Sequence, residues 1–144
     1  MDIPVPIEFP RDDGVHDTSI EWWYFTGNVL TEVSERIGFE YVIFRARPGN
    51  LEGFVSHFAI TSPGREVFVY DQRIGPNTAA PAESGFALSL DGWEMTAASG
   101  SDTLSATMTY GSVGIDLTLE AEKDAVLNNG RGYVHFGRAG RAHY

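Results

Sequence analysis

Apolar residues in this chain alternate with polar ones over short runs, and almost no stretch repeats at the 3.6-residue spacing of a helix. Within 104–110, Leu, Ala, Met and Tyr alternate with Ser and Thr, and within 113–119 Val, Ile and Leu alternate with Gly, Asp and Thr. Successive side chains of a strand point to opposite faces, so each run predicts a strand with one buried face. The pattern as a whole predicts an all-β protein.

Turn-forming residues separate these runs. Gly, Pro, Asn and Ser gather at 47–50, 62–64 and 75–85, and Asp91-Gly92 is the strongest hairpin signal in the chain. Strands are expected at 22–30, 37–45, 53–61, 66–72, 86–90, 93–97, 104–110, 113–119 and 133–136, with a long surface loop at 75–85. A set of short antiparallel strands in one domain predicts either a sandwich or a closed barrel.

The first two predicted strands carry large side chains on both faces. In the first, Glu21, Trp23 and Phe25 point one way and Trp22, Tyr24 and Thr26 point the other. In the second, Phe39, Tyr41 and Ile43 share one face and Glu40, Val42 and Phe44 the other. A barrel that encloses a ligand needs apolar residues inside and outside, as these two strands have, while the later strands show one apolar face only, so the pattern suggests a closed barrel beside the sandwich.

Composition narrows the function classes. The chain has 144 residues, 20 acidic and 10 basic ones, a net charge of −10 and a single lysine, Lys123, so no nucleic-acid partner is expected. The absence of Cys excludes disulfides, thiol nucleophiles and Cys-ligated zinc. No apolar run approaches the about 20 residues of a membrane span, and residues 1–6 lack the features of a signal peptide. The compartment stays open: cytoplasmic, or periplasmic or secreted after removal of a leader.

The densest chemical signal is Asp12-Asp13-Gly14-Val15-His16 followed by Glu21-Trp22-Trp23-Tyr24. A carboxylate that shares a strand face with aromatic rings would have a raised pKa and would serve as a proton donor. The alternative is that the Trp residues belong to the core and that Glu21 pairs with an arginine such as Arg45 or Arg73. His16 with Asp12 and Asp13 matches no firm metal-ligand spacing, so no metal is expected.

Two further polar residues on apolar strands have two interpretations each. His57 would donate a hydrogen bond or relay a proton to a substrate, or it is a core histidine with satisfied hydrogen bonds. Arg45 would contact a ligand, or it neutralises a buried carboxylate.

The motif Asp-x-Gly-x-His, followed by Glu-Trp-Trp-Tyr-Phe-Thr-Gly-Asn-Val-Leu at 21–30, resembles the opening of the carotenoid 1,2-hydratase (hydroxyneurosporene synthase) family and its AttH-like, lipocalin-like relatives. The similarity continues along the chain in order and spacing. It covers 38–45, Ser56-His57-Phe58-Ala59-Ile60, Gln72-Arg73, Asp91-Gly92-Trp93 and 127–144.

The resemblance implies an all-β, lipocalin-like antiparallel β-barrel over residues 1–144. Members of the family have two such barrels in tandem, of which this chain matches the first, so the sequence is expected to be a fragment, a domain or a subunit. It also implies an elongated apolar ligand of isoprenoid or polyketide type. Three functions occur on such a fold: acid-catalysed addition of water to a terminal alkene, pericyclic cyclisation, and carriage of a lipid-like ligand without catalysis. Fold does not choose among them.

Hydration of an alkene requires a positioned acid, aromatic faces beside the cation and a water, but no metal or organic cofactor. The candidate catalytic residues are Glu21 and His57. The candidate ligand contacts are Trp22, Trp23, Tyr24, Tyr41, Phe58 and Arg45. Expected partners are an apolar small molecule and either a second lipocalin-like domain or another copy of the chain.

Overall fold

The computed structural model describes residues 7–98, 101–110, 113–136 and 140–143 and consists of two four-stranded antiparallel sheets. The first sheet contains β1 (Ile20–Leu30), β2 (Arg36–Ala46), β3 (Gly53–Ser62) and β4 (Val67–Gly75), in that order. The second contains β5 (Phe86–Leu90), β6 (Trp93–Ala98), β7 (Ser101–Thr107) and β8 (Gly114–Leu119), also in order. A separate hairpin pairs β9 (Tyr133–Phe136) with β10 (Gly140–His143), and single turns of 3-10 helix lie at η1 (Arg11–Asp13), η2 (Pro63–Arg65) and η3 (Asn128–Gly130).

The strands follow the alternation of the sequence closely. Each of the predicted strands has a counterpart, and the one predicted at 104–110 lies at 101–107 instead, since the chain turns before Tyr110, which is 92% exposed. Asp91 and Gly92 both have positive φ, 49° and 80°, as a two-residue type I′ hairpin requires, so this turn is confirmed. The short strand β10 has no clear signal in the sequence, and the opening residues 1–6 lie outside the described part.

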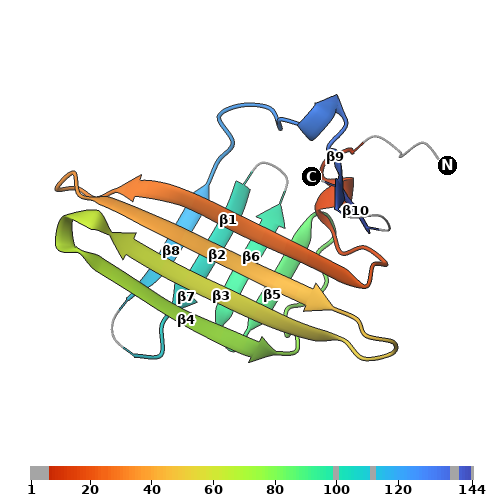
Figure 1. The fold of residues 1–144 in the computed structure, drawn as a ribbon, viewed down its shortest axis with the longest axis horizontal. Coiled ribbons are helices and arrows are strands. Elements are labelled where there is room, and N and C mark those ends of the chain that lie inside the picture. Colours follow the sequence, from red (N-terminus) through yellow and green to blue (C-terminus); the bar gives the residue numbers. More distant parts are fainter. Residues whose placement is uncertain (1–6, 99–100, 111–112, 137–139, 144) are drawn as a thin grey trace.

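The two sheets pack face to face, and their strands cross steeply (Figure 1). The core lies between them and is filled by side chains. Tyr41 and Phe58 from the first sheet meet Trp93 from the second in edge-to-face contacts, with ring centroids 5.7 to 6.0 Å apart. Other fully buried core residues are Ile43, Leu88, Leu90, Met95 and Leu104.

The sheets are not closed into a barrel, so that part of the fold prediction is wrong. Within the described residues no strand ladder joins β1 to β8 or β4 to β5. The chain leaves β4 at Gly75 and reaches β5 at Phe86 through a loop rather than a hairpin. Closure depends on strand tilt and stagger around the whole ring, which the two-residue alternation of the sequence does not encode.

Polar contacts from β4 join the two sheets where no ladder does. The amide of Thr109 donates to Asp71 Oδ2 at 2.7 Å, and Arg73 Nη1 lies 3.0 Å from the same oxygen. These donors hold the pKa of the Asp71 carboxyl well below its usual range. Asp71 and Arg73 therefore attach the edge of the first sheet to the segment that follows β7.

None of the helical segments in the described part of the chain is long and apolar enough to cross a membrane.

Candidate functional site

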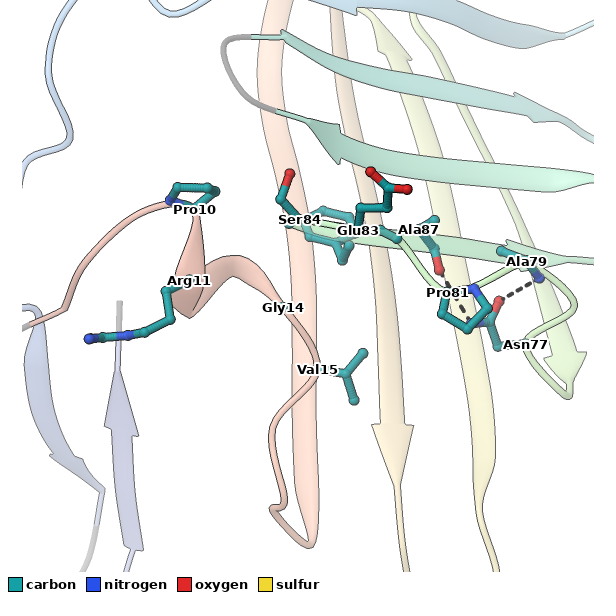
Figure 2. Close-up of a pocket in the computed structure, with 13 residues that line it drawn as sticks. Pro10, Arg11, Gly14, Val15, Asn77, Ala79, Pro81, Glu83, Ser84 and Ala87 are labelled. Carbon is teal, nitrogen blue, oxygen red and sulfur yellow. Dashed lines mark hydrogen bonds between the residues drawn. The ribbon is translucent and has the colours of Figure 1, made fainter.

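A cleft of about 710 Å³ opens at the rim of the molecule, where the segment before β1 faces the loop between β4 and β5 (Figure 2). We call these the N-terminal wall (residues 10–16) and the β4–β5 loop (residues 76–85). Most of the lining residues are small or apolar, including Pro10, Gly14 and Val15 on one side and Ala79, Pro81 and Phe86 on the other, and the rest are polar. The volume falls within the range of natural small-molecule sites.

The β4–β5 loop is held in place by the side chain of Asn77. Its Oδ1 accepts hydrogen bonds from the amides of Ala79, at 3.1 Å, and Ser89, at 2.8 Å. Its Nδ2 donates to the carbonyl of Ala87 at 3.3 Å. One side chain thus attaches the start of the loop to strand β5 at several points, as Figure 2 shows in part.

Gly85 ends the loop at a position that only glycine fits. Its φ is +66°, and a Cβ there would lie 2.1 Å from the carbonyl oxygen of Ala97. The backbone of the loop therefore rests directly on β6, and the far wall of the cleft is attached to the second sheet.

The N-terminal wall is attached to the first sheet through Trp23. The indole Nε1 donates to the carbonyl of Asp13 at 2.9 Å, and the ring packs on Phe86 with centroids 5.6 Å apart. Trp23 thereby contacts a residue on each side of the cleft without lining it.

A half-buried cluster of polar side chains, with His16 and Glu52 at its exposed side, supports the same wall next to Val15. Glu21 Oε1 lies 2.5 Å from His16 Nδ1, and the amide of His16 donates to both carboxylate oxygens. Arg45 Nη1 donates to the carbonyl of His16 at 2.8 Å and lies 3.4 Å from Glu21 Oε2, and its Nε donates to Glu52 at 2.7 Å. The arginine side chain is 6% exposed. The sequence alternative in which Glu21 pairs with Arg45 is therefore present in the structure.

The predicted site residues divide between the two faces of the first sheet. Glu21, Trp23, Tyr41, Arg45 and Phe58 lie on the inner face, and Trp22, Tyr24 and His57 lie on the outer face. Glu21 and His57, the two candidate catalytic residues, are therefore on opposite sides of one sheet. None of these residues lines the cleft, although Trp23 and Glu21 support its N-terminal wall.

Tyr41 is an unusual member of the core. Its side chain is fully buried, and its hydroxyl has no hydrogen-bond partner among the described residues. Burial raises the pKa of this phenol far above its usual value. Tyr41 is therefore a neutral polar group without a hydrogen bond in a core that also contains the fully buried Ser56.

Two carboxylates near the N-terminal wall have raised pKa values. Burial raises the pKa of Asp102 and of Asp13, and the charge of Asp102 adds to the effect on Asp13. Asp12, in contrast, is hydrogen-bonded by Arg11, which lowers its pKa to about 2. The described part of the chain contains no group of three or more His, Asp or Glu side chains placed to hold a metal ion.

The cleft residues themselves carried almost no chemical signal in the sequence. They are mostly Gly, Ala, Pro and Val, and the segment 75–85 indicated only a surface loop. Arg11, Glu83 and Ser84 supply the polar groups at the edge, and the Arg11 side chain points away from the loop in Figure 2.

Comparisons with known proteins agree with one another. The family model described as AttH-like matches residues 1–144. A crystal structure at 2.00 Å resolution of a protein from Nitrosomonas europaea, described as a candidate AttH, superimposes with a TM-score of 0.76 at 25% sequence identity. The match covers 94% of this chain and 44% of that one, so this chain spans less than half the length of the solved protein. No curated protein matches the chain.

Proposed function

Because this chain belongs to the AttH-like family, we propose that it is a binding module that takes a small, largely apolar organic molecule into the cleft between the N-terminal wall and the β4–β5 loop. The observation that carries this proposal is the cleft itself, about 710 Å³ and lined mainly by small or apolar residues. Burial of apolar ligand surface supplies the binding energy in such a site.

The packing of the core favours a ligand site at the rim of the molecule rather than one enclosed between the two sheets. Between the sheets, Tyr41, Phe58 and Trp93 are 0 to 1% exposed and in mutual contact. A ligand there would have to displace packed side chains, whereas the cleft receives one without any core rearrangement. The ligand class that fits the resemblance and the lining is an isoprenoid or polyketide-like molecule, with Glu83 and Ser84 available to a polar end.

The test uses a neutral fluorescent probe, N-phenyl-1-naphthylamine, with variants that fill the cleft. Val15→Trp and Ala79→Trp add a large ring to opposite walls and are expected to lower probe affinity at least tenfold. Val33→Trp is the matched control, because Val33 is 80% exposed and is not among the residues that line the cleft. Equal affinity of all variants would count against the cleft as the site. Native mass spectrometry of the purified chain would identify any molecule that co-purifies.

A second candidate function is acid-catalysed hydration of a terminal alkene, with Glu21 as the acid. The specific observation in its favour is the 2.5 Å contact between Glu21 and His16, because a carboxyl group and an imidazole in contact can pass a proton between them. Val15, the neighbour of His16, lines the cleft, so the pair lies next to a lining residue of the N-terminal wall.

The hydration proposal is tested by turnover of an acyclic carotenoid with a terminal alkene. Glu21→Gln is expected to abolish water addition while probe binding in the cleft persists. Turnover by this variant at the parent rate would exclude Glu21 as the acid and leave the binding proposal untouched.

A further inference from the structure

The polar groups at the cleft determine which kind of polar end a bound ligand can have. Four of the lining residues have polar side chains, namely Arg11, Asn77, Glu83 and Ser84. The other lining residues are glycine or apolar and carry no charge. The chemistry of the site therefore depends on which of these four side chains can still bind a ligand.

Arg11, the positively charged residue among those that line the cleft, is already neutralised. Its Nη1 lies 2.9 Å from Glu8 Oε2, and its Nε donates to Asp12 Oδ1 at 2.8 Å. The side chain also points away from the β4–β5 loop in Figure 2. Two carboxylates beside one guanidinium leave this group with a net negative charge. An anionic end of a ligand would therefore gain little from Arg11.

The hydrogen-bond donors at the start of the β4–β5 loop are occupied as well. Asn77 Nδ2 donates to the carbonyl of Ala87, and Asn77 Oδ1 accepts from the amides of Ala79 and Ser89. The amide of Thr78 donates to the carbonyl of Ser89 at 2.9 Å. Backbone anion sites are built from successive N–H groups that point at the ligand. The donors of Asn77, Thr78 and Ala79 are instead used within the protein.

Glu83 is a charged group of the cleft that is still available. The side chains of Glu83 and Ser84 have no hydrogen-bond or ion-pair partner in the part of the chain that the structure describes, and both residues are exposed. Figure 2 shows the two side chains near each other on the loop. A carboxylate only accepts hydrogen bonds, and a hydroxyl can accept them too, so together they suit a positively charged donor.

Further carboxylates beside the cleft add to its negative charge. Asp13 precedes the lining residue Gly14 in the N-terminal wall. Burial, and to a smaller extent the charge of Asp102 on β7, raises the pKa of Asp13, so these two carboxyl groups are close enough to interact. The chain as a whole has a net charge of −10. A field of this sign raises the local concentration of cations and lowers that of anions.

We propose that the ligand of this cleft has an apolar body and a protonated amine at one end, with Glu83 as the counter-ion, an inference that rests on the proposed binding function. The ammonium group donates to Glu83 and Ser84 at the edge of the cleft, and the apolar body lies against Val15, Ala79 and Phe86. An exposed ion pair changes affinity by only about two- to fivefold. Glu83 therefore contributes selectivity, while burial of the apolar body contributes most of the affinity.

The test compares three fluorescent dansyl sulfonamides that share one alkyl chain and end in a primary amine, a hydroxyl or a carboxylate. At pH 7 and low salt, we expect the amine to bind about tenfold more tightly than the carboxylate, with the alcohol between them. Added salt is expected to reduce this difference, because salt screens exposed charges. Val15→Trp is expected to weaken all three probes, since their apolar bodies share the cleft.

Glu83→Gln tests whether Glu83 is the counter-ion. This variant is expected to weaken binding of the amine about two- to fivefold and to leave binding of the alcohol unchanged. Glu32→Gln is the matched control, because Glu32 is also exposed, does not line the cleft and changes the net charge of the chain by the same amount. The control is expected to bind all three probes as the parent does.

Two results would overturn the charge preference and leave the binding function intact. One is a carboxylate probe that binds as tightly as the amine, and the other is an amine probe with the same affinity for Glu83→Gln and Glu32→Gln. If no probe binds, or if Val15→Trp binds all three as the parent does, the cleft is not the ligand site. The charge preference would then fall together with the proposed function.

Discussion

The guanidinium of Arg73 on β4 lies 4.3 Å from the centre of the Trp93 ring on β6, so a cation–π contact joins the two sheets. The carbonyl oxygen of Thr107 accepts hydrogen bonds from both side chains, at 2.8 Å from Trp93 Nε1 and 3.3 Å from Arg73 Nη2. Trp93 is 1% exposed, so the contact is shielded from water. Cation–π interactions are stronger when they are desolvated in this way. Because no ladder joins the two sheets in the part of the chain that the structure describes, this contact helps to fix their relative position.

Replacement of Arg73 by lysine is expected to lower the free energy of unfolding by about 1 to 2 kcal/mol. A lysine keeps the charge but loses the planar stacking and the forked hydrogen bonds. Urea unfolding measures the change, and Arg65→Lys, at a 70% exposed side chain paired with Glu35, is the control with little expected effect. Equal losses in the two variants would show that stacking on Trp93 contributes nothing.

Asp71 makes stability depend on pH at the acid end. Its pKa is lowered on folding by the Thr109 amide and by Arg73, so the ionised form stabilises the native state. This contribution is complete above the unfolded-state pKa of about 3.9 and is lost as pH falls below it. Asp71→Asn is expected to flatten the fall of melting temperature below pH 4, while substitution of the exposed Asp116 by Asn leaves it unchanged. A variant with the acid dependence of the parent would contradict this.

Asp102 makes stability depend on pH in the opposite direction to Asp71. Burial raises its pKa, so protonation favours the native state, and the contribution is present at low pH and lost as pH rises through the folded-state value. Asp102→Asn is therefore expected to unfold at a higher temperature than the parent at pH 7, with the difference disappearing near pH 3. Calorimetry at both pH values measures this, and a lower melting temperature at pH 7 would exclude the burial penalty.

Tyr41→Phe removes the unpaired hydroxyl from the core. Because nothing in the described structure bonds to that group, its loss is expected to leave stability unchanged or to raise it by about 1 kcal/mol. Tyr41→Ala, which also removes the ring, should cost about 3 to 5 kcal/mol. Chemical denaturation of both variants separates the hydroxyl from the ring, and a loss of more than about 1 kcal/mol in Tyr41→Phe would reveal a hydrogen bond to the hydroxyl.

Gly85→Ala is expected to be more damaging than Gly92→Ala, although both residues have positive φ, +66° and +80°. A methyl group at Gly92 meets nothing within 4 Å, so only the backbone penalty of about 1 kcal/mol applies. At Gly85 the methyl group lies 2.1 Å from the carbonyl oxygen of Ala97 and must displace the loop. We expect both the melting temperature and the affinity for the fluorescent probe to fall in Gly85→Ala, and the probe affinity to stay unchanged in Gly92→Ala. Retained binding in that variant would mean that the loop position does not shape the cleft.

The composition of the cleft explains why the sequence did not reveal it. Ala79, Pro81 and Gly85 have no reactive groups. They lie near Val15 because two segments distant in sequence are held at the cleft: Asn77 attaches one to strand β5, and Trp23 attaches the other to the first sheet. The motif around Glu21, in contrast, was conspicuous in sequence, and the structure places it beneath the N-terminal wall in contact with Arg45.

Alternation of apolar and polar residues determined the strands, their faces and the Asp91-Gly92 turn, because side-chain direction in a strand and backbone conformation in a tight turn are local properties. It also indicated that β1 and β2 carry bulk on both sides. Only the tertiary structure decided that the sheets stay open, that Tyr41 and Phe58 fill the core, and that His57 lies on the opposite face from Glu21. Those outcomes depend on strand stagger and on contacts between residues far apart in the chain, and no local pattern contains them.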